Sequence, residues 1–95
     1  MARSDLQVRW MGYAVMRAAR RGFPQAAVEQ ILLHSTERYA EPATGRRVAI
    51  GRIARALVLV VYETDGPDTL VPVTMHTTTR RQIASRVQRG DLSYG

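Results

Sequence analysis

The side chains with the clearest chemical potential lie close together in the chain, before and at the start of a predicted helix. Thr74 and His76 alternate with apolar residues and are expected to share one face of a strand, opposite Val73 and Met75. The helix is expected to begin at Thr79, so that its free backbone N–H groups form an anion-binding end near His76. This pattern favours a phosphate-binding site; alternatively, Thr79 only caps the helix and the arginines are solvated. The whole cluster is Thr74, His76, Thr78, Thr79, Arg80 and Arg81.

The sequence lacks the residue patterns of most enzyme classes. It has no cysteine, and its two histidines, His34 and His76, lie far apart with no paired carboxylates near either. Metal-ligand spacing, a glycine-rich phosphate loop and a nucleophile elbow are also absent from the sequence. Metal-free ribonuclease chemistry passes this filter, because RNA supplies its own 2′-hydroxyl nucleophile and the protein has only to move protons and stabilise charge. We therefore expect no metal and no cofactor.

The positive charge of the chain comes entirely from arginine. All fourteen basic residues are arginine, the formal net charge is +6, and the pI is about 11.0. A GC-rich genome would favour arginine by itself, whereas a functional explanation is that guanidinium groups bind phosphate in a bidentate way. The charge then indicates a polyanion or an acidic protein as partner. One group flanks the predicted central strand, where it either solubilises strand ends or follows an RNA backbone: Arg46, Arg47, Arg52 and Arg55.

The elements that position these side chains follow from periodicity and turn residues. Apolar residues at helical spacing predict one helix from Val8 to Arg21 and a second from Pro24 to about His34. A capping box of Thr79 and Gln82 is expected at the start of the last helix, with each side chain bonding the other's backbone. The later segments are a short polar Arg38–Glu41, strands Arg46–Arg52, Ala56–Tyr62 (central) and Thr69–His76, a helix Arg80–Arg89 and a frayed tail at residues 91–95.

This order predicts a single α+β domain over residues 1–95. It would have two N-terminal helices, a three- to four-stranded antiparallel sheet and a C-terminal helix. Pro72 has no backbone donor, so its strand is expected at a sheet edge or with a bulge. No apolar run is long enough for a signal peptide or a spanning helix, so we expect a cytoplasmic protein without membrane contact.

From about Arg20 to Val87, the sequence resembles the BrnT family of RelE-like toxins. The approximate family patterns are KHGVSFEEA, GEERYVAIGR, LLVVVYT and SARKATRRE, in this order. The matching segments are Arg21–Ala27, Thr44–Arg52, Leu57–Tyr62 and Thr78–Gln82. The sequence departs from these patterns at three places: His76 replaces an arginine, Arg20-Arg21 replaces a lysine-histidine pair, and Ile53-Ala54 replaces polar turn residues.

The resemblance implies a RelE-like fold and a ribonuclease that inhibits translation. It also implies a cognate antitoxin that binds DNA and represses the shared operon, so that the toxin would meet DNA only through the antitoxin. Histidine is a competent acid–base group. Activity therefore either persists through His76 or is altered or lost by this replacement.

These observations, with the resemblance, predict the toxin component of a type II toxin–antitoxin system, which cleaves RNA without a metal; the RNA is either free or ribosome-associated mRNA. We expect His76, Arg52 and Arg80 to be catalytic and an acidic or mixed-charge antitoxin segment to cover the arginine face. One alternative is a non-catalytic basic module that binds RNA or an acidic protein; another is that the arginines reflect genome composition alone. The residues expected to bind RNA phosphates are Arg46, Arg47, Arg55, Arg81 and Thr79.

Overall fold

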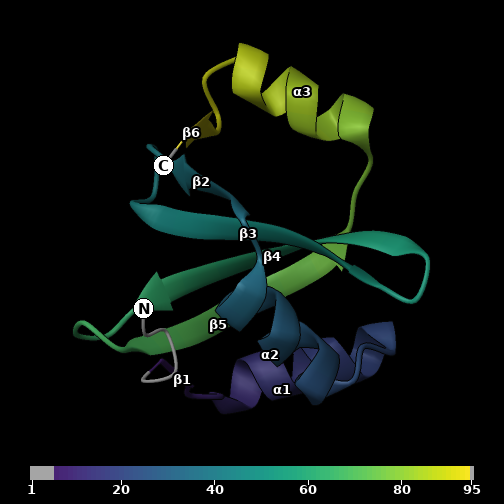
Figure 1. Cartoon of the computed structure of the whole chain (residues 1–95), viewed down its shortest axis with the longest axis vertical. Coiled ribbons are helices and arrows are strands. Elements are labelled where there is room, and N and C mark those ends of the chain that lie inside the picture. Colours follow the sequence, from purple (N-terminus) through teal and green to yellow (C-terminus); the bar gives the residue numbers. More distant parts are fainter. Residues whose placement is uncertain (1–5, 95) are drawn as a thin grey trace.

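The computed structural model describes residues 6–94, which form an α+β structure of three helices and a six-stranded mixed sheet. The strand order across the sheet is β1-β5-β4-β3-β2-β6. Figure 1 shows α1 and α2 on one side of this sheet and α3 on the other. The elements are β1 (Gln7–Val8), α1 (Gly12–Arg21), α2 (Gln25–His34), β2 (Glu37–Glu41), β3 (Arg46–Ile53), β4 (Ala56–Thr64), β5 (Thr69–Thr77), α3 (Arg80–Gln88) and β6 (Ser93–Tyr94).

The prediction of a central strand is confirmed, because β4 lies between β3 and β5 and is buried on both faces. Val58 and Val60 belong to the core beneath α1 and α2, whereas Leu57 and Leu59 belong to the core beneath α3. A strand covered on both sides needs apolar residues at consecutive positions, which is the pattern of this segment. The antiparallel meander β2-β3-β4-β5 is therefore the central layer, and the helices pack on its two faces.

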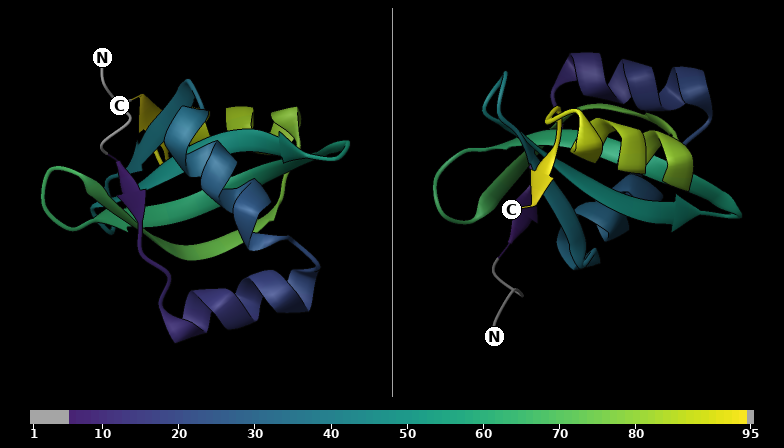
Figure 2. Two further views of the ribbon diagram at one scale, coloured as in Figure 1. Left: turned by 60° about the horizontal axis from the view of Figure 1, so that its bottom comes forward. Right: turned by 90° about the horizontal axis from the view of Figure 1, so that it is seen from above.

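The α2 helix packs very close to the sheet. A Cβ atom built on Gly51 of β3 would lie 2.6 Å from Cγ1 of Ile31, so a larger residue at this position would push the helix away. Ile31 is itself buried in the core beneath α1 and α2. Glycine at position 51 thus allows the approach of the two layers (Figure 2).

The predicted start of the first helix at Val8 is wrong, because this residue belongs to a strand. Val8 pairs in parallel with Leu70 of β5, and α1 begins at Gly12. The backbone N–H of Gln7 donates to Asp68 at 2.8 Å and that of Arg9 to Leu70 at 2.9 Å. The backbone N–H groups of Gln7 and Arg9 thus find partners in a distant segment rather than in a helix. Because β1 runs parallel to β5, the sheet is mixed and not purely antiparallel as predicted.

The C-terminal segment is also more ordered than predicted. Leu92 is only 1% exposed and packs in the core beneath α3, while Ser93 and Tyr94 form β6 against β2. The prediction of a frayed tail is therefore wrong for residues 91–94, and residue 95 lies outside the described residues. Burial of the Leu92 side chain and the contact of the Tyr94 ring with that of Tyr39, 5.6 Å between centroids, help to hold this short strand in place.

The bulge predicted from Pro72 is confirmed. The β4–β5 register shifts between Val61, which pairs with Thr74, and Tyr62, which pairs with Pro72, leaving Val73 as the extra residue. As a result Val73 packs against the core beneath α3, whereas Met75 is buried beneath α1 and α2. The expectation that Val73 and Met75 share one face is therefore wrong.

Candidate functional site

His76 lies on the α3 side of the sheet, beside a hollow between β5 and α3. It pairs with Leu59, whose side chain belongs to the core on that side. The hollow has a volume of about 500 Å³, and we call it the β5–α3 cleft. Residues at positions 81, 85 and 89 share one helix face because they are four apart. The lining residues are His76, Thr77, Thr78, Arg81, Gln82, Ser85, Arg86 and Arg89.

The first helix adds positive charge to the same region. The Nη1 atom of Arg17 donates to the Oγ1 atom of Thr74 at 3.0 Å, so the side chain of Arg17 reaches β5 two residues before His76. Burial, followed by the charges of Arg21, Arg86 and Arg17, lowers the pKa of His76 below its ordinary value of 6.5. The imidazole is therefore neutral at pH 7 and able to accept a proton.

The charges around His76 are largely unbalanced. Among the ion pairs of residues 6–94, Arg86 binds Glu41 at 3.0 Å and Arg89 binds Asp91 at 2.9 Å. Arg17, Arg21 and Arg81 form no ion pair with the carboxylates in this part of the chain. Uncompensated guanidinium groups near a neutral histidine make an electrostatic site for an anion, and for phosphate in particular.

The N-terminus of α3 is held by its own side chains. The Oγ1 atom of Thr79 accepts a hydrogen bond from the backbone N–H of Gln82 at 3.1 Å, which confirms the cap. The second half of the predicted capping box is not formed, because Oε1 of Gln82 accepts from the hydroxyl of Thr78 at 3.2 Å instead. The oxygen of Thr79 thus stabilises the helix end.

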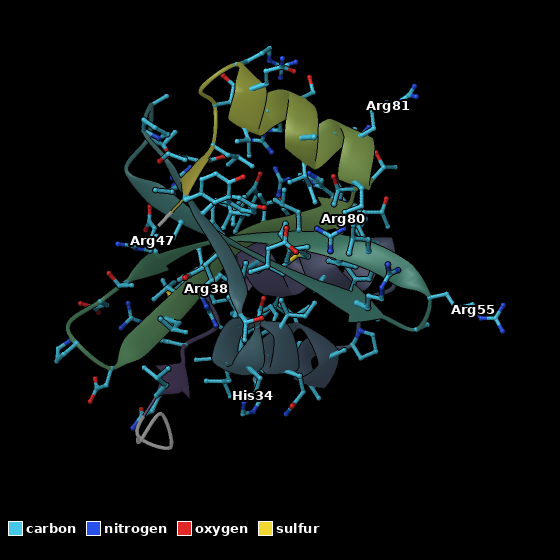
Figure 3. The ribbon with its side chains drawn as sticks, turned by 45° about the horizontal axis from the view of Figure 1, so that its top comes forward. His34, Arg38, Arg47, Arg55, Arg80 and Arg81 are labelled. Atoms are coloured by element: carbon cyan, nitrogen blue, oxygen red, sulfur yellow. The ribbon has the colours of Figure 1, made fainter. Side chains whose placement is uncertain are left out.

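Arg80 and Arg81 are neighbours in sequence but lie on different sides of α3. Nη1 of Arg80 donates to both carboxylate oxygens of Glu37, at 2.8 and 2.7 Å, and the hydroxyl of Tyr39 donates to Oε2 of Glu37 at 2.7 Å. Burial raises the pKa of Glu37, but the hydrogen bonds from Arg80 and Tyr39 and the charge of Arg80 outweigh it and lower the pKa. In Figure 3, Arg81 projects outward while Arg80 points to the sheet.

The pKa of Tyr39, the tyrosine of this network, is strongly raised. Burial, its hydrogen bond to Glu37 and the negative charge of that carboxylate raise the pKa of Tyr39 to about 12. Tyr39 therefore stays protonated and holds Glu37 in place for Arg80. The structure thus places Arg80 in an ion pair with β2, away from His76.

The other predicted site residues are spread over the β3–β4 hairpin. Arg46 forms an ion pair with Glu63 at 2.9 Å, and Nη1 of Arg52 donates to the backbone oxygen of Arg55 at 3.1 Å. Arg47 and Arg55 are exposed and lie at opposite ends of the hairpin (Figure 3). Of the eight residues predicted from the sequence, the structure brings together His76 and Arg81 in the β5–α3 cleft and places Thr79 at the nearby helix cap.

Sequence reasoning missed the contribution of α1 and a structural role for Arg38. Arg17 and Arg21 are four residues apart and share a helix face, a spacing that could have marked them as a pair. Arg38 donates to the backbone oxygens of Leu32 at 2.6 Å and Ser35 at 3.0 Å, which secures the end of α2. Arg38 also donates to the hydroxyl of Tyr62 at 2.9 Å, so each of its three side-chain nitrogens forms a hydrogen bond inside the fold.

We expect the stability of the protein to fall as the pH drops below 6.5, in part because of His76. Its folded-state pKa is lowered, so the unfolded chain binds the proton first and stability is lost on acidification. Urea unfolding at pH 7.5 and 5.5 would measure this for the native protein and for His76→Asn. The native protein should lose more stability than the variant; equal losses would show that His76 does not have a lowered pKa.

Residues 6–94 hold no group of three or more His, Cys, Asp or Glu side chains that could bind a metal ion together. No helix in the described part of the chain is long and apolar enough to cross a membrane. Comparisons with protein-family models, with curated proteins and with solved structures find no match to this chain.

Proposed function

We propose that this protein is a metal-independent ribonuclease of the RelE-like toxin type, related to the BrnT family, and that the β5–α3 cleft is its active site. The observation that carries this proposal is a histidine with a lowered pKa among arginines that have no carboxylate partner in residues 6–94. This revises the set suggested by the sequence: Arg17 and Arg21 take the place of Arg52 and Arg80, while Arg81 keeps its predicted role at the phosphate.

The proposed reaction needs only the RNA and these side chains. Neutral His76 removes the proton from a 2′-hydroxyl, whose oxygen attacks the adjacent phosphorus. The bond from phosphorus to the 5′-oxygen breaks, and that oxygen takes a proton from solvent. Arg17, Arg21 and Arg81 stabilise the extra negative charge on the phosphorane. The products are one fragment with a 2′,3′-cyclic phosphate end and one with a 5′-hydroxyl end. His76 then returns its proton to solvent.

The charge of the cleft also suggests how such a toxin would be silenced. The net charge is +6, and Arg17, Arg21 and Arg81 have no carboxylate partner among residues 6–94. An antitoxin with an acidic segment would neutralise these groups and exclude RNA. Contact with DNA would then come through the antitoxin rather than through this chain.

A second candidate is a basic module that binds RNA or an acidic protein without cleaving it. The observation that favours it is that no side chain of residues 6–94 forms a hydrogen bond with His76. Catalytic bases are commonly oriented by such a partner. The same arginines would then serve binding alone.

Growth after induced expression would separate the two candidates in the cell. We expect the native chain to arrest growth and His76→Ala to relieve the arrest at equal levels of folded protein. Co-expression of the neighbouring open reading frame should also relieve it if this frame encodes the antitoxin. Absence of arrest from well-folded native protein would contradict the toxin proposal and favour the binding module.

A further inference from the structure

A second hollow lies on α1, next to the β5–α3 cleft. It has a volume of about 260 Å³ and is lined by Tyr13, Met16, Arg17, Arg20 and Arg21. Two of its residues also belong to the surroundings of His76: Arg17 contacts Thr74 of β5, and the charge of Arg21 lowers the pKa of His76. Arg17 and Arg21 thus bring the second hollow near His76.

One aromatic side chain, Tyr13, lines this second hollow and is open to solvent. Tyr13 is 55% exposed, and Met16 beside it is also exposed. The guanidinium carbon of Arg17 lies 4.5 Å from the centre of the Tyr13 ring, and Nη2 of Arg17 also donates to the Tyr13 hydroxyl. Tyr13 and Thr74 therefore hold Arg17 from two sides, which fixes one planar group against another.

The charge of the hollow restricts what it can bind. The α1 helix contains no acidic residue, and Arg20 and Arg21 add two further positive charges. The volume is below the roughly 300–1,000 Å³ of pockets for drug-sized ligands, so it suits one small planar group. An aromatic ring, a guanidinium and flanking arginines together match a nucleobase with its neighbouring phosphate.

We propose that Tyr13 and Arg17 form a stacking subsite for a nucleobase next to the phosphate held at His76. This inference rests on the proposed function, and it identifies the substrate as single-stranded RNA. A base paired within a duplex is stacked on its neighbours and cannot lie against Tyr13. Stacking does not depend on the identity of the base, so the subsite tolerates different sequences.

The test measures binding of an RNA oligonucleotide that carries 2′-O-methyl groups and therefore lacks the nucleophile. Its abasic counterpart has the same phosphates but no bases. Fluorescence anisotropy would compare the native protein with Tyr13→Leu and Tyr13→Phe. We expect Tyr13→Leu to weaken binding of the base-bearing strand roughly 5- to 100-fold and to leave the abasic strand unchanged. Tyr13→Phe keeps the ring and should bind the base-bearing strand more tightly than Tyr13→Leu does.

The matched control is Tyr94→Leu, because Tyr94 is 80% exposed and lines a separate hollow with Tyr39 and Arg80. It should leave binding of both strands unchanged. Equal losses for both strands in Tyr13→Leu would mean that Tyr13 only positions Arg17, and no loss would mean that no base stacks there; either result overturns the inference. Binding of neither strand by the native protein would overturn the proposed function as well.

Discussion

Purified His76→Ala protein is expected to cleave single-stranded RNA about 10²–10⁴-fold more slowly than the native protein. His76 lines the β5–α3 cleft, and burial together with the nearby arginine charges lowers its pKa below the ordinary value of 6.5, so the neutral imidazole is available as a base at pH 7. Removal of the imidazole leaves the guanidinium groups in place, so RNA affinity should change little. Single-turnover cleavage with excess protein measures the rate separately from binding.

A matched control for this variant is His34→Ala. His34 is exposed at the end of α2 and does not line the β5–α3 cleft. It should cleave RNA at the native rate. In the native protein the rate should also fall as the pH drops below the lowered pKa of His76, because protonated imidazole cannot act as a base. A His76→Ala protein that cleaves as fast as His34→Ala would contradict the role of His76.

Changing Arg17, Arg21 and Arg81 together to glutamine is expected to weaken RNA binding strongly and to reduce the salt dependence of that binding. Each arginine that neutralises a phosphate on a single strand contributes about 0.7 to the slope of log K against log salt, so three should contribute about 2. By the same relation, affinity at 0.1 M salt should fall about 100-fold. Titration of a labelled single-stranded RNA over a salt series measures both quantities.

The matched control removes the same formal charge from the β3–β4 hairpin. Arg46, Arg47 and Arg55 lie away from His76, and Arg46 is already in an ion pair with Glu63. The triple change to glutamine at these positions should alter the salt slope by much less than the change at Arg17, Arg21 and Arg81. If the hairpin variant loses as much affinity, RNA binds along the sheet face suggested by the sequence rather than in the cleft.

The elements with strong local signals could be predicted from the sequence. The continuous apolar run marked β4 as central, and the missing donor of Pro72 marked the bulge in β5. β1 and β6 have two residues each and exist only because they pair with β5 and β2. Periodicity within the chain contains no information on such distant partners, so it places Val8 in a helix and the C-terminal residues in a tail.

The candidate site shows the same division. His76 and Arg81 are close in sequence, and their proximity follows from a strand that runs into a capped helix. The separation of Arg80 from Arg81 depends on the rotation of α3, which buries Ile83 in the core and places Arg80 against Glu37, 43 residues away. Arg17 reaches Thr74 across 57 residues, so only the packing of α1 against β5 could reveal it.

The end groups of cleaved RNA provide the most direct test that His76 and its arginines form a metal-independent ribonuclease. Native protein would be incubated with a labelled single-stranded RNA in excess EDTA, and the fragments would be analysed. We expect cleavage that leaves 2′,3′-cyclic phosphate and 5′-hydroxyl ends, because the 2′-hydroxyl is the nucleophile. Intact RNA in the presence of folded, RNA-binding protein, or fragments with 5′-phosphate ends, would contradict this mechanism.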